Sequence, residues 1–255
     1  MTISTAIFLF FAGVIGGAMN AVAGGGSFVT FPALLFTGIP PVPANATNTL
    51  SLWVGTAASG GAYRSRSHLP KRVIIPLLLV SLIGGLAGAL LLIRTPAHTF
   101  LRVIPWLMLG ATLLFMFGKL ITGRISGGIS HEASNRGIAV AALFELLVAV
   151  YGGYFGGGIG IMNLAMLAAL GMTDIHDMNA LKVILVSVIN GVAAVTFVVS
   201  GSIMWPQAAV TIAGAAFGGY FAAHFAQQLP QWMVRMMVIL LGLGMTIYFF
   251  LKAYR

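Results

Sequence analysis

Long apolar runs, such as residues 74–93 and 233–251, constrain the fold of this chain more than any other feature. Only 7% of its residues are charged, whereas soluble domains carry roughly 25%. So few charges cannot cover a surface that faces water, and we expect lipid to be the main solvent. In lipid the backbone must be satisfied within helices or a closed barrel, and barrel strands alternate polar and apolar residues. The unbroken apolar runs therefore predict an all-α polytopic membrane protein.

The charge balance is strongly basic, with 13 Lys and Arg residues, 4 Asp and Glu residues and a formal net charge of +9. In a soluble protein this excess would indicate a nucleic acid partner. Here most of the basic residues fall in short loops or at helix ends, where membrane proteins carry them on the cytoplasmic side. We therefore interpret the excess mainly as a topology signal and expect no nucleic acid partner. A positive field that favours anions is the second interpretation.

A spanning helix needs about 20 residues, and eight apolar segments reach that length. They are residues 4–22, 44–62, 72–93, 100–121, 134–152, 178–200, 204–225 and 232–252. Two further apolar segments, 27–37 and 159–170, are too short to span, and each follows a cluster of three glycines. We expect each to be a short re-entrant or broken helix after a glycine-rich turn.

The same order of features occurs in both halves of the chain. A glycine cluster, a short apolar segment, an Asn-Ala pair and long apolar segments follow one another twice, and Asn45 corresponds to Asn179. This order predicts a first transmembrane repeat at 1–121, a cytoplasmic linker at 122–134 and a second repeat at 135–255. Duplicated halves are common in secondary transporters, which bind their substrate where the halves meet.

Basic residues gather in the loop before residue 72, around the linker and at the C-terminus. If all three regions are cytoplasmic, eight spans place both termini in the cytoplasm and the two repeats run parallel. If the short segments also cross the membrane, each half has five spans and the repeats are inverted. That version separates Lys252 and Arg255 from the other basic regions, so the charge rule favours the first topology.

The two glycine clusters are the main candidate site. They consist of Gly24, Gly25 and Gly26 in the first half and of Gly156, Gly157 and Gly158 in the second. Non-helical backbone at membrane depth occurs only where it is buried in protein or lines a wet cavity. A short helix that begins there directs its free N–H groups and positive dipole end at the site. Two such turns predict an anion site, and tight helix packing by small residues is the alternative.

Polar side chains accompany both clusters. Ser27 adds a hydroxyl to the first turn, whereas Ile159 stands at the matching position of the second. The helix starts that follow carry further hydrogen-bond donors, namely Asn45, Thr47, Asn48, Asn179 and Lys182. Amides, hydroxyls and one ammonium suit an oxyanion, and none of them is a carboxylate that would repel it. The alternatives are helix capping for Asn and Thr and snorkelling of Lys182 to the interface.

Glu145 is the only acidic residue well inside a predicted span, which makes it a functional candidate. It would either relay protons for coupled transport or pair with Lys182 or another donor. Asn20 and Asn190 would line the path, with interhelical hydrogen bonds as the alternative. Tyr154 would act as a gate or serve as an interface aromatic.

An enzyme is the remote alternative, because Ser27 and His224 would suit an intramembrane serine protease. That interpretation leaves the second glycine cluster unexplained, and we expect no catalytic residue. The chain has no cysteine, which excludes disulfides and thiolate-bound metals. We also expect no metal site and no cofactor.

Several segments resemble the sulfite exporter TauE/SafE family of bacterial membrane permeases. They are residues 23–27, 32–35 and 46–50 of the first half, and residues 153–160 with Gly171, Asn179, Ala180 and Lys182 of the second. The resemblance implies a multi-pass protein of the cytoplasmic (inner) membrane that exports sulfite or organosulfur anions such as sulfonates. The family's first half often has a basic residue after Thr-Asn, whereas Thr49 follows Asn48 here and the basic residue appears only as Lys182.

We therefore expect an exporter of small anions that works by alternating access between its two repeats. Its export would be driven by the membrane potential alone or by proton exchange through Glu145. A passive anion channel is the alternative. The expected partners are the small anion and the lipid bilayer, and a homo-oligomer is left open.

Overall fold

The computed structural model describes the chain apart from residues 61–70, 123–134, 170–171, 173–174, 226–230 and 255. The described residues form an all-α structure, with no strand among them, which confirms the predicted fold class. The helices are α1 (Ile3–Ala23), α2 (Ser27–Phe36), α3 (Pro41–Gly60), α4 (Lys71–Arg94), α5 (Ala97–Thr122), α6 (Asn135–Tyr154), α7 (Ile159–Ala169), α8 (Ile175–Val199), α9 (Trp205–Phe225) and α10 (Gln231–Tyr254). The predicted linker 122–134 begins at the last residue of α5, and the rest of it lies outside the described residues.

Within the described residues, six helices are long and apolar enough to cross a membrane, namely α1, α4, α5, α6, α8 and α10. The predicted count of eight spans is therefore not confirmed, since α3 and α9, with 20 and 21 residues, are not among these candidates. Both helices pack against several others, α3 against α8 and α9, and α9 also against α1. Most of the described residues of α3 are buried, whereas α9 also exposes large apolar side chains such as Phe217 and Phe221.

The two short segments form short helices after glycine turns. Helix α2 has 10 residues and α7 has 11. Gly24 ends α1 in the left-handed conformation, with φ of 75°, and its N–H donates to the carbonyls of Met19 and Asn20. Gly156 and Gly158 have φ of 77° and 76° between α6 and α7. A side chain is disfavoured at such angles, so both turns depend on glycine.

Two helix pairs pack through small residues, α1 with α9 and α4 with α6. A Cβ atom added to Gly13 would lie 2.7 Å from the carbonyl oxygen of Thr211 in α9. One added to Gly84 would lie 2.6 Å from the Cβ of Ala149 in α6. These glycines therefore allow close backbone contact, as small residues do between membrane helices. Such packing is the role of the glycines within the long helices, in contrast to those of the two turns.

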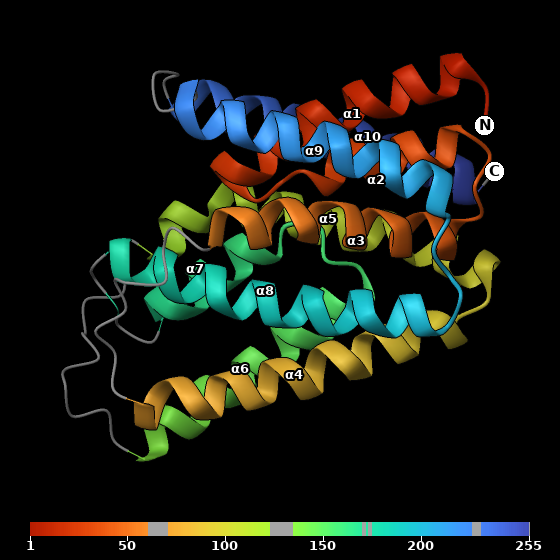
Figure 1. Ribbon diagram of the computed structural model, residues 1–255. Helices are drawn as coiled ribbons and strands as arrows, with labels where there is room; N and C mark the ends of the chain where they lie inside the picture. Colours follow the sequence, from red (N-terminus) through yellow and green to blue (C-terminus); the bar gives the residue numbers. More distant parts are fainter. Residues whose placement is uncertain (61–70, 123–134, 170–171, 173–174, 226–230, 255) are drawn as a thin grey trace.

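Figure 1 shows α1 and α9 along one side of the molecule and α4 and α6 along the opposite side, with α3, α5 and α8 between them. Both termini lie at the same end of the helices, and α2 runs back from its glycine turn toward that end. Helices α3 and α5 finish at the other end, where the chain continues into the loops rich in Lys and Arg. The topology expected first, with both termini and both basic loops on one side, therefore differs from this arrangement. The reason is that α2 and α7 each reverse the direction of the chain.

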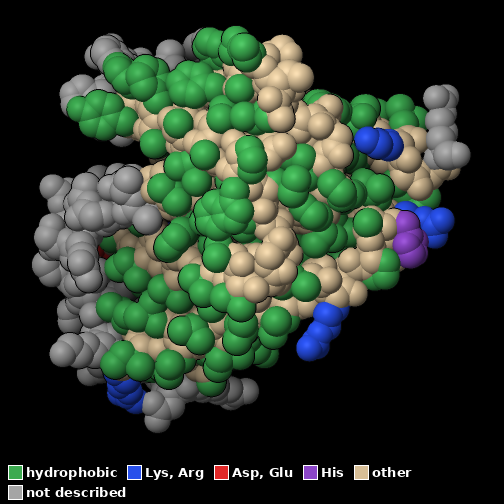
Figure 2. Space-filling view, turned by 45° about the vertical axis from the view of Figure 1, so that its right-hand side comes forward, with side chains coloured by type: hydrophobic (Ala, Val, Ile, Leu, Met, Phe, Trp, Pro, Cys, Tyr) green, Lys and Arg blue, Asp and Glu red, His purple; other side chains and the backbone are tan. Residues whose placement is uncertain are grey.

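The surface fits a lipid environment. Figure 2 shows hydrophobic side chains over most of one face, whereas the Lys and Arg side chains in view lie near its edges. Large apolar side chains on several helices are exposed, among them Phe11, Leu79, Leu143 and Leu240. In water an apolar face of this extent would drive aggregation. In a bilayer it is the expected contact surface.

Candidate functional site

The two glycine turns meet in the structure. A Cβ atom added to Gly24 would lie 3.7 Å from the Cα of Gly160, the second residue of α7. A Cβ atom added to Gly160 would in turn lie 3.6 Å from Cδ of Lys182 in α8. The turn after α1 therefore faces the start of α7, and the stem of Lys182 lies beside Gly160. These residues come from both halves of the chain.

The first turn is fastened to α3 by a buried hydrogen-bond network. Nδ2 of Asn48 donates to Oγ of Ser27 over 3.1 Å. The Thr30 hydroxyl, one turn along α2, donates to Oδ1 of Asn48. Both polar atoms of the Asn48 amide thus hold the first turn of α2. Ser27 accepts in this network, so its own hydroxyl proton is available to a ligand.

Asn45 and Thr47 fix α3 to the second half of the chain. Nδ2 of Asn45 donates over 3.1 Å to the carbonyl oxygen of Tyr154, the last residue of α6. The hydroxyl of Thr47 accepts from the backbone N–H of Met204, just before α9. Oδ1 of Asn45 is buried and has no hydrogen-bond partner within the described part of the chain. Thr47 thus joins two helices, whereas Asn45 still offers an acceptor.

Lys182 and Asn179 form a pair within α8, in which the Lys182 ammonium donates to Oδ1 of Asn179 over 3.0 Å. The partner that the structure shows for this ammonium is thus a neutral amide, and the positive charge is not cancelled. The starts of α2 and α7 add partial positive charge through their helix dipoles, and Phe28, Val29, Ile159 and Ile161 there already donate to carbonyls of the two glycine turns. The sum is a positively charged region beside Gly24 and Gly160.

Asn20 and Asn190 each lie beside a glycine turn, as a path-lining role would require. A Cβ atom added to Gly26 would lie 2.9 Å from Cβ of Asn20. Nδ2 of Asn20 donates to the hydroxyl of Thr56 in α3 over 2.9 Å. A Cβ atom added to Gly156 would lie 3.7 Å from Oδ1 of Asn190. The interhelical hydrogen bond expected as the alternative is therefore present for Asn20.

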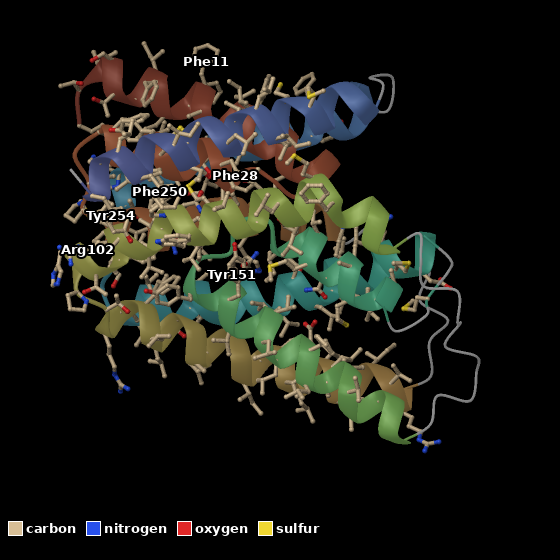
Figure 3. All side chains as sticks on the ribbon, turned by 180° about the vertical axis from the view of Figure 1, so that it is seen from behind. Phe11, Phe28, Arg102, Tyr151, Phe250 and Tyr254 are labelled. Carbon is tan, nitrogen blue, oxygen red and sulfur yellow. The ribbon has the colours of Figure 1, made fainter. Side chains whose placement is uncertain are left out.

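Tyr151 anchors the second turn. Its hydroxyl donates to the carbonyl oxygen of Gly157 over 2.6 Å, and Leu107 of α5 supplies a second acceptor at 3.4 Å. Figure 3 labels Tyr151 close to α5. The neighbouring Tyr154 is buried, and its ring packs edge-on against Phe100 with the centroids 5.5 Å apart. Tyr154 thus contacts the first half of the chain twice, through its ring at Phe100 and through its backbone carbonyl at Asn45.

The hydrogen-bond partner of Glu145 is Ser81 and not Lys182. Glu145 is completely buried, and Oε1 accepts from the hydroxyl of Ser81 in α4 over 2.5 Å. The ion pair with Lys182 that we considered from the sequence is not what the structure shows, because Lys182 donates to Asn179 instead.

Sequence reasoning missed Asn163, a completely buried residue in the middle of α7. Both polar atoms of its side-chain amide are buried without a partner among the described residues. The available signal was an amide within a short, otherwise apolar helix at membrane depth. Amides at helix starts act as caps and were therefore the expected polar positions, whereas Asn163 lies in the middle of its helix.

Comparison with known proteins agrees with this picture. The family model described as "Sulfite exporter TauE/SafE" matches residues 9–249. A "Probable membrane transporter protein" of Haemophilus influenzae is 28% identical over 239 residues, which are 93% of this chain and 91% of that protein. The "Probable membrane transporter protein ORF9" of a Sinorhizobium species is 24% identical over 240 residues, 94% of this chain and 90% of that protein. The "Probable membrane transporter protein YfcA" of Escherichia coli K12 is 23% identical over 244 residues, 93% of this chain and 87% of that protein. No solved structure matches the chain significantly.

Proposed function

Because the chain belongs to the sulfite exporter TauE/SafE family, we propose that this multi-pass membrane protein exports sulfite or small organosulfur anions such as sulfonates. The observation that carries the proposal is the meeting of Gly24 and Gly160 beside Lys182. The anion would bind there to backbone N–H groups of both turns. The Lys182 ammonium, the Ser27 hydroxyl and nearby amides would supply the remaining contacts.

The chemistry of the site supports an oxyanion. The starts of two helices supply several weak donors, which suit the spread-out charge of a sulfite or sulfonate group. One uncancelled cation supplies the long-range attraction. Glycine at positions 24 and 160 lets the ligand approach the backbone directly, because no Cβ atom stands in between. Nothing in this chemistry calls for a catalytic residue.

The packing supports two inverted repeats of five helices each, in which α1 corresponds to α6, α2 to α7 and so on to α10. Under this correspondence the contact of α1 with α9 matches that of α6 with α4, and α3 with α9 matches α8 with α4. When the two repeats are exchanged, the contact of α3 with α8 maps onto itself, and so does the contact of α5 with α10. Inverted repeats are a common basis of alternating access, with the site near the middle of the bilayer.

The charge distribution then orients the protein. The end at which α3 and α5 finish is the more basic one, because α4 and α6 begin there with Lys71, Arg72 and Arg136 and the sequence segments that follow α3 and α5 contain Arg64, Arg66 and Arg124. Arg102 and Tyr254 lie together at the other end (Figure 3), where α4 ends at Arg94 and Lys252 lies in the last turn of α10. The charge rule places the more basic end in the cytoplasm of the inner membrane. Both termini then lie on the opposite side, which replaces our first expectation of cytoplasmic termini.

Outward transport of an anion is favourable in itself, since moving one negative charge out of a negative interior releases about 2.3 kcal/mol per 100 mV. A passive channel would use the same driving force, so energetics alone does not separate the two functions. They differ in kinetics, because an alternating-access transporter saturates and exchanges labelled for unlabelled anion.

The test is flux in proteoliposomes with sulfite, methanesulfonate and the neutral analogue dimethyl sulfone. We expect saturable flux and counterflow of the two anions and none of the neutral compound. Non-saturating flux without counterflow would favour the channel. Equal rates for all three compounds would contradict an anion site.

A further inference from the structure

A buried carboxyl group with an unsatisfied oxygen lies in the middle of α6. Glu145 is 0% exposed, and Ser81 satisfies only Oε1. Oε2 has no hydrogen-bond partner in the described part of the protein. An ionised carboxylate in such a place is costly unless a cation pairs with it, whereas a bound proton removes the charge. This group is not needed to bind the anion, so it calls for a separate explanation.

Asn163 is the second unsatisfied group of this region. It is 0% exposed, and neither Nδ2 nor Oδ1 has a partner among the residues described. Burying an amide without hydrogen bonds costs free energy, and such groups in native proteins usually mark a missing ligand or a functional role. Two unsatisfied groups of this kind on neighbouring helices have a common explanation if one ligand serves both.

Packing places the two side chains at the same level. On one side, Ala141 of α6 belongs to the same apolar cluster as Met166 and Leu167 of α7. On the other side, Val148 and Ala149 of α6 cluster with Ile159 of α7. Glu145 lies one turn from each α6 group, and Asn163 lies one turn from each α7 group. Glu145 and Asn163 thus lie at matching levels of α6 and α7 between two apolar clusters, and Ser81 joins this level through its hydrogen bond to Glu145.

We propose that Glu145 carries a transported proton, with Ser81 and Asn163 as its hydrogen-bonding partners. In the protonated state Oε2–H would donate to Oδ1 of Asn163. In the ionised state Nδ2 of Asn163 would donate to Oε2, since an amide offers an acceptor on one side and donors on the other. A rotation of the Asn163 side chain therefore satisfies both states. No bond other than the O–H bond of Glu145 forms or breaks.

Few ionisable groups surround this layer. Helices α4, α7 and α8 pack against α6. Their ionisable side chains are Lys71, Arg72 and Arg94 at the ends of α4 and His176, Asp177 and Lys182 on α8, and α7 has none. Within α6 itself they are Arg136, Tyr151 and Tyr154. The Lys182 ammonium donates to Asn179, so the partners shown for Glu145 are neutral.

The proton is coupled to the anion through α7, an inference that rests on the function proposed above. Asn163 lies one turn beyond Gly160, where the two glycine turns meet. An ionised Glu145 repels an anion bound there, and a protonated Glu145 does not. Charges about 10 Å apart in a protein interior would change anion affinity roughly tenfold. Proton and anion therefore bind together and move in the same direction, which makes transport of a monovalent anion electroneutral. Export then follows the anion gradient in place of the potential that would drive the anion alone.

The test uses the full-length protein in proteoliposomes with methanesulfonate, which is the anion of a strong acid and brings no proton of its own. Anion flux and internal pH are recorded together, while potassium and valinomycin set the membrane potential. We expect one proton per anion, drive by a pH gradient and no response to the potential. In Glu145→Gln, proton movement is lost and the flux becomes dependent on the potential. Thr246→Val, which removes a buried hydroxyl that donates to Gly242 in α10, serves as the control with unchanged coupling.

A second measurement detects the proton on Glu145 and does not depend on transport. The infrared band of a protonated carboxyl group should be present in the wild type, absent in Glu145→Gln and shifted in Asn163→Leu. Absence of this band in the wild type would overturn the proposal, even if no probe anion were transported. So would potential-driven flux without protons, unchanged coupling in Glu145→Gln, or drive by a sodium gradient in place of the pH gradient. Saturable anion flux without proton movement would contradict the proton proposal and leave the proposed anion export intact. Absence of anion flux in a protein that shows the carboxyl band would contradict only the proposed anion export.

Discussion

The first glycine turn is followed by side chains that hydrogen-bond to one another, whereas the second is followed by a cation and by an amide without a partner among the described residues. In the first half, Asn48 joins Ser27 and Thr30 in a hydrogen-bond network between α2 and α3, which leaves the Ser27 hydroxyl proton available. In the second half, the position of Asn48 corresponds to that of Lys182, and that of Ser27 to Ile159. The backbone pattern is similar, but the first turn is held rigidly and the second carries the charge.

This difference indicates a division of labour between the repeats. A buried hydrogen-bond network fixes local geometry. A cation beside a neutral amide attracts an anion, and an amide without partners in α7 can respond to a ligand. We therefore expect changes at Lys182 to alter transport more than stability, and changes at Asn48 to do the reverse.

The largest effect on transport is expected for Lys182→Met, which keeps the length of the stem and removes the charge. Losing one close charge-assisted contact to a bound oxyanion costs about 1.5–3 kcal/mol, so the efflux rate at low methanesulfonate concentration should fall at least about tenfold. Lys252→Met at the end of α10 is the matched control and should keep the parent rate. An equal loss in both variants would mean that Lys182 acts only through the overall charge.

Asn48→Leu should affect stability most. It leaves the buried hydroxyl of Ser27 without its donor, which costs about 1–3 kcal/mol, while the Thr30 hydroxyl keeps the Gly26 carbonyl as acceptor. Thermal unfolding in detergent should therefore begin at a lower temperature than in Lys182→Met. Transport per folded molecule should fall less than in the lysine variant. If Lys182→Met were the less stable variant, or if Asn48→Leu lost more transport per folded molecule, the proposed division of labour would be contradicted.

The sequence was sufficient for features that depend on local composition. Apolar runs indicated the helices, and the two glycine clusters located the turns before α2 and α7. Features that depend on the register between helices were not predictable. Whether Asn48 meets Ser27, or Glu145 meets Ser81 rather than Lys182, depends on which faces of distant helices pack together.

The topology shows the same limit. The basic residues at the C-terminus suggested that it lies with the basic loops, because the charge rule weighs each loop separately. The reversal of the chain by α2 and α7 places the termini at the other end (Figure 1). The amide of Asn163 in an apolar helix was a local signal, but whether it has a hydrogen-bond partner depends on the helices that pack against α7.

Gly24→Ala tests whether the meeting of the two turns matters beyond backbone strain. Gly24 and Gly38 both have positive φ, at 75° and 86°, so alanine should cost about 1–2 kcal/mol of stability at either position. The added Cβ atom would face Gly160 at position 24 but has no atom within 4 Å at position 38. We expect similar losses in thermal stability, with slower transport only for Gly24→Ala. Slower transport in both variants would assign the effect to strain.

The smallest effect is expected for Ser27→Ala, which sharpens the comparison between the two turns. The second turn has Ile159 at this position, so an anion site there works without a hydroxyl, and the Ser27 proton adds one neutral hydrogen bond to the ligand. Such a bond contributes about 0.5–1.5 kcal/mol, and the apparent affinity for methanesulfonate should weaken roughly two- to tenfold. Ser51→Ala is the control, because its buried hydroxyl donates to the Thr47 carbonyl within α3 and faces no turn. If both serine variants changed affinity equally, the first turn would contribute only structure, and anion recognition would belong to the second repeat alone.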